Sequence, residues 1–126
     1  MLRRSRLSFL VARRFYMSAP ASLCLLRTSA IGDVTHVVPL VRTLQAAWPE
    51  TRLCWIVGTL ERRLVGDLPG VDFVGFDKGK GLAGMREVWA ALRGRRFDAL
   101  LQMQVALRSN LLSLGIRADQ RIGYDR

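Results

Sequence analysis

Residues 22–34, SLCLLRTSAIGDV, contain the stretch that decides the fold. Residues 22–27 form a continuous apolar run of strand length, as expected of a strand that is covered on both faces. Residues 28–32 are small and predict a loop, and Asp33 follows where the N-cap of a helix is expected. A buried strand that leads through a short loop into a helix is the repeating unit of parallel α/β sheets.

The same alternation continues along the chain about every 25 residues. The apolar spacing that begins at Val34 predicts a helix that ends near Trp48 and is kinked at the interior Pro39. The segment at residues 78–84, KGKGLAG, favours a flexible basic loop. Further strands are predicted at residues 52–57, 71–76, 97–103 and 121–124, and further helices at 60–67, 85–93 and 106–114. This order predicts an α/β fold with a Rossmann-like, doubly wound parallel sheet and right-handed crossovers.

Residues 1–20 differ in composition from the rest of the chain. The first 16 residues contain five arginines and no acidic residue, and their apolar stretch is shorter than a secretory signal requires. This composition would also fit a mitochondrial presequence or a basic helix at a membrane surface. We interpret residues 1–20 as a basic extension with Met17 as a candidate initiator, and residues 21–126 as the folded domain.

The formal net charge of +10 does not by itself predict a nucleic-acid partner. After residue 16 the chain carries 15 basic and 10 acidic groups, and the basic groups are scattered. Nucleic-acid binding needs a clustered basic footprint, so we expect no nucleic acid. A phosphorylated substrate or an anionic lipid fits the positive bias equally well. No apolar run reaches the ~20 residues that cross a bilayer.

The cysteine and histidine content argues against a metal site. Cys24 and Cys54 each lie in a predicted strand, where reduced core thiols are favoured over a disulfide. His36 is the single histidine and the chain has no CxxC pair. A zinc site is therefore excluded, and no metal is expected.

The loop after the first strand is the candidate functional site, because ligands of doubly wound sheets bind beyond the carboxyl ends of the strands. Residues 27–33, RTSAIGD, match neither GxGxxG nor GxxxxGK[ST], which argues against ordinary NAD or ATP binding. Gly32 would allow a tight turn and the close approach of a ligand. Asp33 has two possible roles, a helix cap or a general base. His36 would share its helix face and either orient the carboxylate or serve the structure alone.

With these residues in place, the sequence resembles glycosyltransferase family 9, the lipopolysaccharide heptosyltransferases. Members of that family begin with an apolar strand, a [KR]-[TS]-[ST]-x-[IML]-G-D loop and a helix with an H-x-x-P pattern. The resemblance covers about residues 22–126 and includes RIGYDR at residues 121–126. The residues that match the loop and the helix are Arg27, Thr28, Ser29, Ile31, Gly32, Asp33, His36 and Pro39.

The resemblance implies an enzyme with two Rossmann-like domains, the GT-B architecture. Its N-terminal domain binds the acceptor, which is Kdo or heptose on lipid A, and its C-terminal domain binds the donor, ADP-heptose. Transfer would be inverting and independent of a metal or cofactor, at the cytoplasmic face of the bacterial inner membrane. The present chain would be a truncated N-terminal domain, incomplete as a sheet, without the donor domain and inactive alone.

The resemblance also implies roles for individual residues. Asp33 would be the base that deprotonates the acceptor hydroxyl, with Thr28, Ser29 and Gly32 around it and His36 near the substrate. Lys78 and Lys80 would lie near acceptor phosphates and carboxylates, unless they only belong to a solvated loop. Gln104 and Arg108 match a Q-x-x-x-[KR]-[ST] pattern facing the cleft, where Arg108 would pair with an anionic group or simply occupy a helix N-terminus.

Three other interpretations stay open at this stage. The chain could be a non-catalytic Rossmann-like module that binds a nucleotide or a partner, which titration with ADP or NAD would reveal. It could be a basic protein attached to an anionic membrane or nucleic acid through residues 1–16, in which case their deletion abolishes salt-sensitive binding. It could also be a gene remnant that does not fold.

Overall fold

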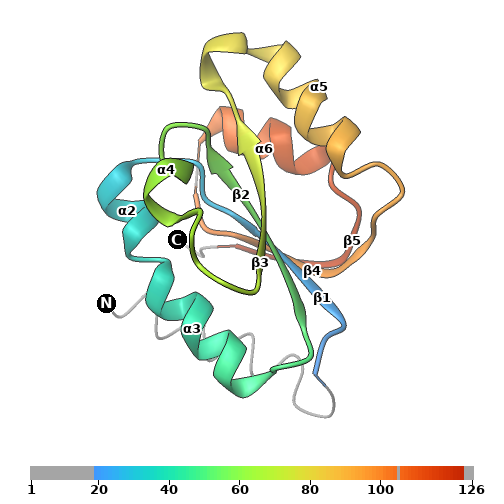
Figure 1. Ribbon diagram of the computed structural model, residues 1–126. Helices are drawn as coiled ribbons and strands as arrows, with labels where there is room; N and C mark the ends of the chain where they lie inside the picture. Colours follow the sequence, from blue (N-terminus) through green and yellow to red (C-terminus); the bar gives the residue numbers. More distant parts are fainter. Residues whose placement is uncertain (1–18, 105, 124–126) are drawn as a thin grey trace.

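The continuous apolar runs of the sequence form the strands of a parallel sheet (Figure 1). The computed structural model describes residues 19–104 and 106–123. The five strands lie in the order β3-β2-β1-β4-β5, and every neighbouring pair is parallel. Their bounds are β1 Ser22–Leu26, β2 Arg52–Gly58, β3 Val71–Phe76, β4 Phe97–Gln102 and β5 Ala118–Gly123. The predicted doubly wound α/β fold is thus confirmed.

Two helical layers cover the sheet, one on each face (Figure 1). Leu23 and Leu25 pack with the helices of one layer, and Cys24 and Leu26 with those of the other. Successive side chains of a strand point to opposite faces, so a strand covered twice must be apolar throughout. The first layer contains α2 Ile31–Thr35, α3 Val38–Ala47 and α4 Arg62–Val65, and the second contains α5 Leu82–Ala91 and α6 Leu107–Leu114.

The predicted single helix up to Trp48 is wrong. The chain forms two helices, α2 and α3, separated by a turn at residues 36–37. Pro39 lies in the first turn of α3 rather than in a helix interior, where its missing N–H removes no helical hydrogen bond. The apolar spacing continued across the break because Val34, Val37, Leu40 and Val41 all face the same core.

The predicted flexible loop at residues 78–84 is also partly wrong. Residues Lys78–Lys80 form a short 3-10 helix, η1, and α5 begins at Leu82. The Asp77 carboxylate accepts a hydrogen bond from the Gly79 N–H at 2.9 Å and so caps η1. In addition, β5 begins at Ala118, earlier than residue 121, and α5 begins and ends earlier than predicted. Such shifts are common because termini depend on local capping.

Both cysteines are free and fully buried, as the sequence predicts. Cys24 and Cys54 are register partners on the adjacent strands β1 and β2. A hydrogen bond between the two side chains, together with burial, raises the pKa of the Cys24 thiol well above its ordinary value. The same hydrogen bond lowers the pKa of the Cys54 thiol. Burial, which keeps reagents away from both sulfur atoms, therefore protects the pair.

We therefore expect both thiols to resist alkylation in the folded protein. Iodoacetamide at pH 8 should modify neither cysteine in buffer and both in 6 M guanidinium, as read by intact mass. Rapid modification in buffer would contradict the burial of this strand pair.

None of the helices within the described residues is long and apolar enough to cross a membrane. The predicted basic extension at residues 1–20, with Met17, falls almost wholly outside the described residues.

Candidate functional site at the switch point of the sheet

The sheet reverses its order at β1, and the candidate site lies at this point. The chain winds from β1 to β2 and β3 on one side and then returns to β4 and β5 on the other. In doubly wound sheets such a point is where a ligand-binding crevice is expected, here between the segments that follow the carboxyl ends of β1 and β4. These segments carry the loop of residues 27–30 and Gln104.

Gln104 ties these two segments together. Its side-chain oxygen accepts hydrogen bonds from the backbone N–H and the hydroxyl of Thr28, both at 2.9 Å. Its amide nitrogen donates to the Ser29 hydroxyl at 3.3 Å. Thr28 is buried. These predicted site residues thus come together, but their polar groups are used to hold the loop.

Arg27 is a site residue that the sequence analysis did not assign. Its side chain crosses the switch point and donates to the Met103 carbonyl on the β4 side. The same guanidinium pairs with the Asp33 carboxylate, with 2.7 Å between Nη2 and Oδ2. The signal was available in the sequence, since a basic residue that directly ends a buried strand needs an acceptor or solvent.

Asp33 does not cap its helix. The N-cap of α2 is Ala30, and Asp33 lies in the first turn without a capping hydrogen bond. The helix begins earlier than predicted, and the carboxylate turns to Arg27 instead. Its side chain remains 57% exposed, whereas that of Arg27 is only 18% exposed. A partly buried guanidinium therefore orients a carboxylate that stays accessible to a ligand.

Gly32 and His36 lie near the two ends of α2. Gly32 lies inside α2 without a positive φ, so the predicted tight turn at this residue is wrong. A Cβ placed on Gly32 would meet no atom within 4 Å, which leaves open space beside Asp33. His36 is the exposed C-cap of α2. Within the described part of the chain, no hydrogen bond or ion pair joins it to Asp33.

Replacing Gly32 with alanine should stabilise the protein. The position is helical and open, and alanine costs about 0.5–1 kcal/mol less than glycine in a helix. Urea denaturation of Gly32→Ala should show this gain, and a clear loss of stability would contradict the open position. Weaker ligand binding by the stabilised variant would indicate that the space beside Asp33 receives a ligand.

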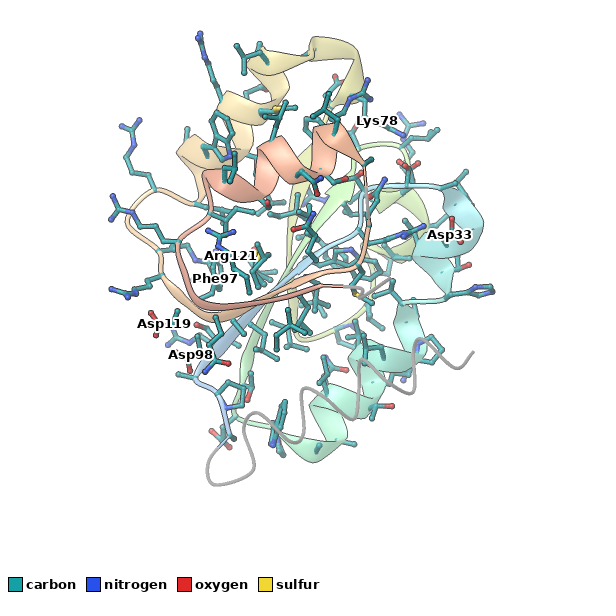
Figure 2. All side chains as sticks on the ribbon, turned by 180° about the vertical axis from the view of Figure 1, so that it is seen from behind. Asp33, Lys78, Phe97, Asp98, Asp119 and Arg121 are labelled. Atoms are coloured by element: carbon teal, nitrogen blue, oxygen red, sulfur yellow. The ribbon has the colours of Figure 1, made fainter. Side chains whose placement is uncertain are left out.

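The remaining predicted residues lie at the same edge of the sheet but in different settings. Lys78 is half-buried and its Nζ is 3.9 Å from Glu61 Oε2. Lys80 instead forms hydrogen bonds to both oxygens of Glu87 at 3.0 Å on the surface. Arg108 is exposed in the first turn of α6. In Figure 2, Asp33 and Lys78 lie toward one end of the sheet, and Asp98 and Asp119 toward the other.

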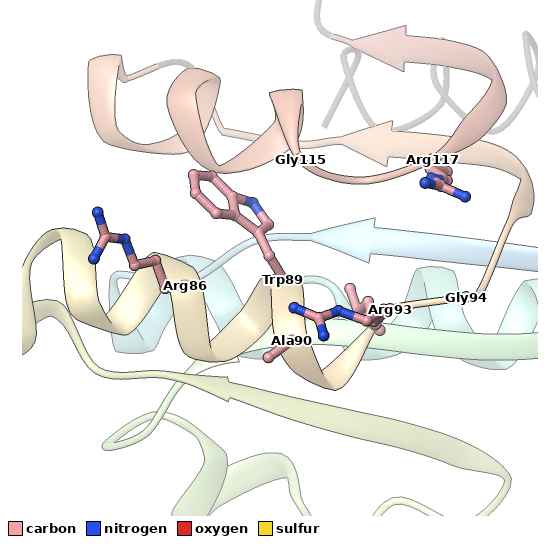
Figure 3. Close-up of a pocket in the computed structure, with 8 residues that line it drawn as sticks. Arg86, Trp89, Ala90, Arg93, Gly94, Gly115 and Arg117 are labelled. Atoms are coloured by element: carbon pink, nitrogen blue, oxygen red, sulfur yellow. The ribbon is translucent and has the colours of Figure 1, made fainter.

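Two larger hollows lie away from this edge. One of about 480 Å³ is bounded by Trp89, Arg93 and Arg117 near the C-terminal ends of α5 and α6 (Figure 3). The second, of similar volume, adjoins it near Arg95 and Arg121. All of these residues except Arg121 precede β4 or β5, and Arg121, within β5, donates to the Ser113 and Ile116 carbonyls around the C-terminal end of α6. Arginines there complement the negative ends of the helix dipoles. We therefore do not assign either hollow to the functional site.

The chemistry that this arrangement offers is proton transfer. An exposed carboxylate, held by one guanidinium at the switch point, can accept a proton from a bound hydroxyl. Within residues 19–104 and 106–123, no three His, Cys, Asp or Glu side chains gather in a way that would hold a metal ion.

Comparison of the fold with solved structures defines the class of protein. A family 9 glycosyl transferase from Veillonella parvula superposes with a TM-score of 0.73 at 17% identity, over 82% of this chain and 32% of that one. The heptosyltransferase WaaC from Escherichia coli, solved with ADP, gives a TM-score of 0.72 at 21% identity, over 82% of this chain and 34% of that one. The fold is thus the one found in family 9 glycosyltransferases.

Sequence comparison adds a relative with a more specific name. The lipopolysaccharide core heptosyltransferase OpsX of Haemophilus influenzae is 43% identical over 109 residues, which are 86% of this chain and 31% of that protein. No protein-family model matches the chain. The chain is thus similar in sequence to a lipopolysaccharide core heptosyltransferase and in fold to family 9 glycosyltransferases. It spans about a third of the length of these relatives.

Proposed function

We propose that this chain supplies part of the acceptor-binding domain of an inverting heptosyltransferase that acts on the lipopolysaccharide core. The observation that carries this proposal is Asp33, an exposed carboxylate fixed by Arg27 at the switch point of the sheet. The similarity to a lipopolysaccharide core heptosyltransferase supports the choice of reaction. The donor would be ADP-heptose, bound by a second domain, and the acceptor would be Kdo or heptose on lipid A.

In the proposed reaction, Asp33 removes the proton from one acceptor hydroxyl. The resulting oxygen nucleophile attacks the anomeric carbon of the heptose from the face opposite to ADP, and the bond to the ADP oxygen breaks. The proton ends on the Asp33 carboxylate and the negative charge on ADP, so no metal or cofactor is needed for balance. Arg27 holds the carboxylate in place, and Gln104 holds the loop of Thr28 and Ser29 beside it.

The remaining candidate residues would contact the acceptor or the membrane in which its lipid lies. Lys78 and Arg108 project at the same edge of the sheet, where Arg108 suits the phosphates and carboxylates of the inner core. Gly32 leaves room for the acceptor sugar, and His36 lies one helical turn further on. A lipid-linked acceptor would place the protein at the cytoplasmic surface of the inner membrane.

Titration of the isotopically labelled chain with a deacylated Kdo disaccharide tests this proposal. Amide signals of residues 28–33 and 106–108 should shift in a saturable way, because these residues surround the crevice. Maltose, which carries no carboxylate, is the control and should cause no comparable shifts. A folded chain whose crevice signals ignore the Kdo disaccharide would contradict the proposed acceptor role.

A further inference from the structure

A small hollow of about 220 Å³ lies near the loop of residues 27–30, which leads into the helix that carries Asp33. It is lined by residues 59–61 and 76–79, which follow the carboxyl ends of β2 and β3. The Gly58 N–H donates to the Thr28 carbonyl at 2.9 Å, so the hollow and the loop share a wall. Helices α2 and α4 also contact each other across this edge (Figure 1).

Glu61 is the unusual residue of this hollow. Its side chain is only 5% exposed, yet no other described residue makes a hydrogen bond to either carboxylate oxygen. Oε1 is buried without a partner against the backbone of Gly58, where any Cβ would collide with it. A buried carboxylate that lacks donors is costly, so its presence calls for a partner that supplies them.

Lys78 lies opposite Glu61 but does not form a hydrogen bond with it. Its Nζ is 3.9 Å from Glu61 Oε2, which is too long for a hydrogen bond, and 39% of its side chain is exposed. Asp77, the neighbouring acid, already accepts from the Gly79 N–H. The hollow therefore presents one acceptor and one donor, both charged, and neither is fully used.

The chemistry of this pair selects a neutral ligand that both donates and accepts. The Glu61 carboxylate would repel an anionic ligand, and the Lys78 ammonium would repel a cationic one. A hydroxyl group satisfies both, since it donates its proton to the carboxylate and accepts from the ammonium. At ordinary hydrogen-bond lengths one oxygen can reach both Glu61 Oε2 and Lys78 Nζ, because these two atoms are only 3.9 Å apart. The hydroxyl thus satisfies the Oε2 side of the carboxylate, and Oε1 stays against Gly58.

We propose that Glu61 and Lys78 form a hydroxyl-binding subsite for the acceptor saccharide, next to the hydroxyl that Asp33 deprotonates. This inference rests on the proposed function and adds a specific anchor to it. It also separates the two lysines of this segment. Lys80 is already paired with Glu87 on the surface and has no part in the subsite.

Variants of the full chain test the subsite in the titration with the Kdo disaccharide. Glu61→Gln and Lys78→Met each remove one charge-assisted hydrogen bond and should weaken binding about tenfold. The matched controls Glu87→Gln and Lys80→Met remove the same charges from an exposed pair and should change the dissociation constant less than twofold. Circular dichroism checks that each variant is folded. If Glu61→Gln does not fold, the affinity of Lys78→Met tests the subsite.

The pattern of amide shifts separates this inference from the proposed function. Saturable shifts at residues 58–61 and 78–79, together with those at 28–33, support both. Shifts at residues 28–33 alone, with unchanged affinity in Glu61→Gln and Lys78→Met, overturn the subsite and leave the acceptor role standing. No shift at either place overturns both. A crystal structure with saccharide bound, in which only a water molecule bridges Glu61 and Lys78, also overturns the subsite.

Discussion

Replacing Asp33 with asparagine is expected to lower heptose transfer by a factor of about 10² to 10⁴, the usual contribution of a general base. The variant is best made in a chimera in which residues 22–123 replace the aligned segment of the Haemophilus influenzae heptosyltransferase. Asparagine keeps the shape of the side chain and removes the basic oxygen. The acceptor KM should therefore change little while kcat falls, as read in a radiolabelled transfer assay.

Asp67→Asn is the matched control for this experiment. Asp67 is also an exposed acid, but it lies in the turn after α4 and follows no strand at the crevice. Its substitution should leave kcat within about twofold. Full transfer activity in a folded Asp33→Asn chimera would contradict the assignment of Asp33 as the general base. Equal losses of kcat in Asp33→Asn and Asp67→Asn would show a general effect of charge.

Trp55→Ala is expected to cause the largest loss of stability. Trp55 is fully buried in β2, packs against Phe73 with 5.6 Å between ring centroids, and donates from Nε1 to the Arg27 carbonyl at 3.1 Å. Truncation of such a residue costs about 3–5 kcal/mol, a large part of the roughly 5–15 kcal/mol that stabilises a typical domain. Urea denaturation of the chain would measure the loss of unfolding free energy.

Trp55→Phe separates packing from the hydrogen bond. Phenylalanine keeps an aromatic ring in the core but leaves the Arg27 carbonyl without its donor, at a cost of about 1–3 kcal/mol. We expect it to lie between the wild type and Trp55→Ala. An alanine variant as stable as the wild type would contradict the central position of Trp55 in this core.

The strands could be predicted from the sequence, because a strand that is covered by helices on both faces is apolar at every position. Residues 23–26 and 53–57 are apolar at every position, and the structure buries alternate side chains under opposite helical layers. The break between α2 and α3 left no such signature. Its residues keep facing one core, so the apolar spacing runs through it, and only Pro39 marks the new helix.

The candidate site was only partly predictable, for a related reason. The position of Asp33 after β1 follows from the order of elements. The sequence did not show that the N-cap of α2 is Ala30 and that the Asp33 carboxylate pairs with Arg27 instead. Gln104 was selected as a ligand-binding residue, whereas its hydrogen bonds to Thr28 and Ser29 hold the loop. Glu61 was missed, because a charged residue in a short polar segment gives no sign that it will be buried.

Heptose transfer by the unmodified chimera tests the central claim most directly. The measurement is the rate of transfer from ADP-heptose to Kdo-linked lipid A, compared with the parent enzyme. We predict a folded chimera that retains transfer, reduced at most about a hundredfold by the new interface between domains. A folded chimera that binds ADP-heptose like the parent but transfers no heptose would contradict the acceptor role of this chain.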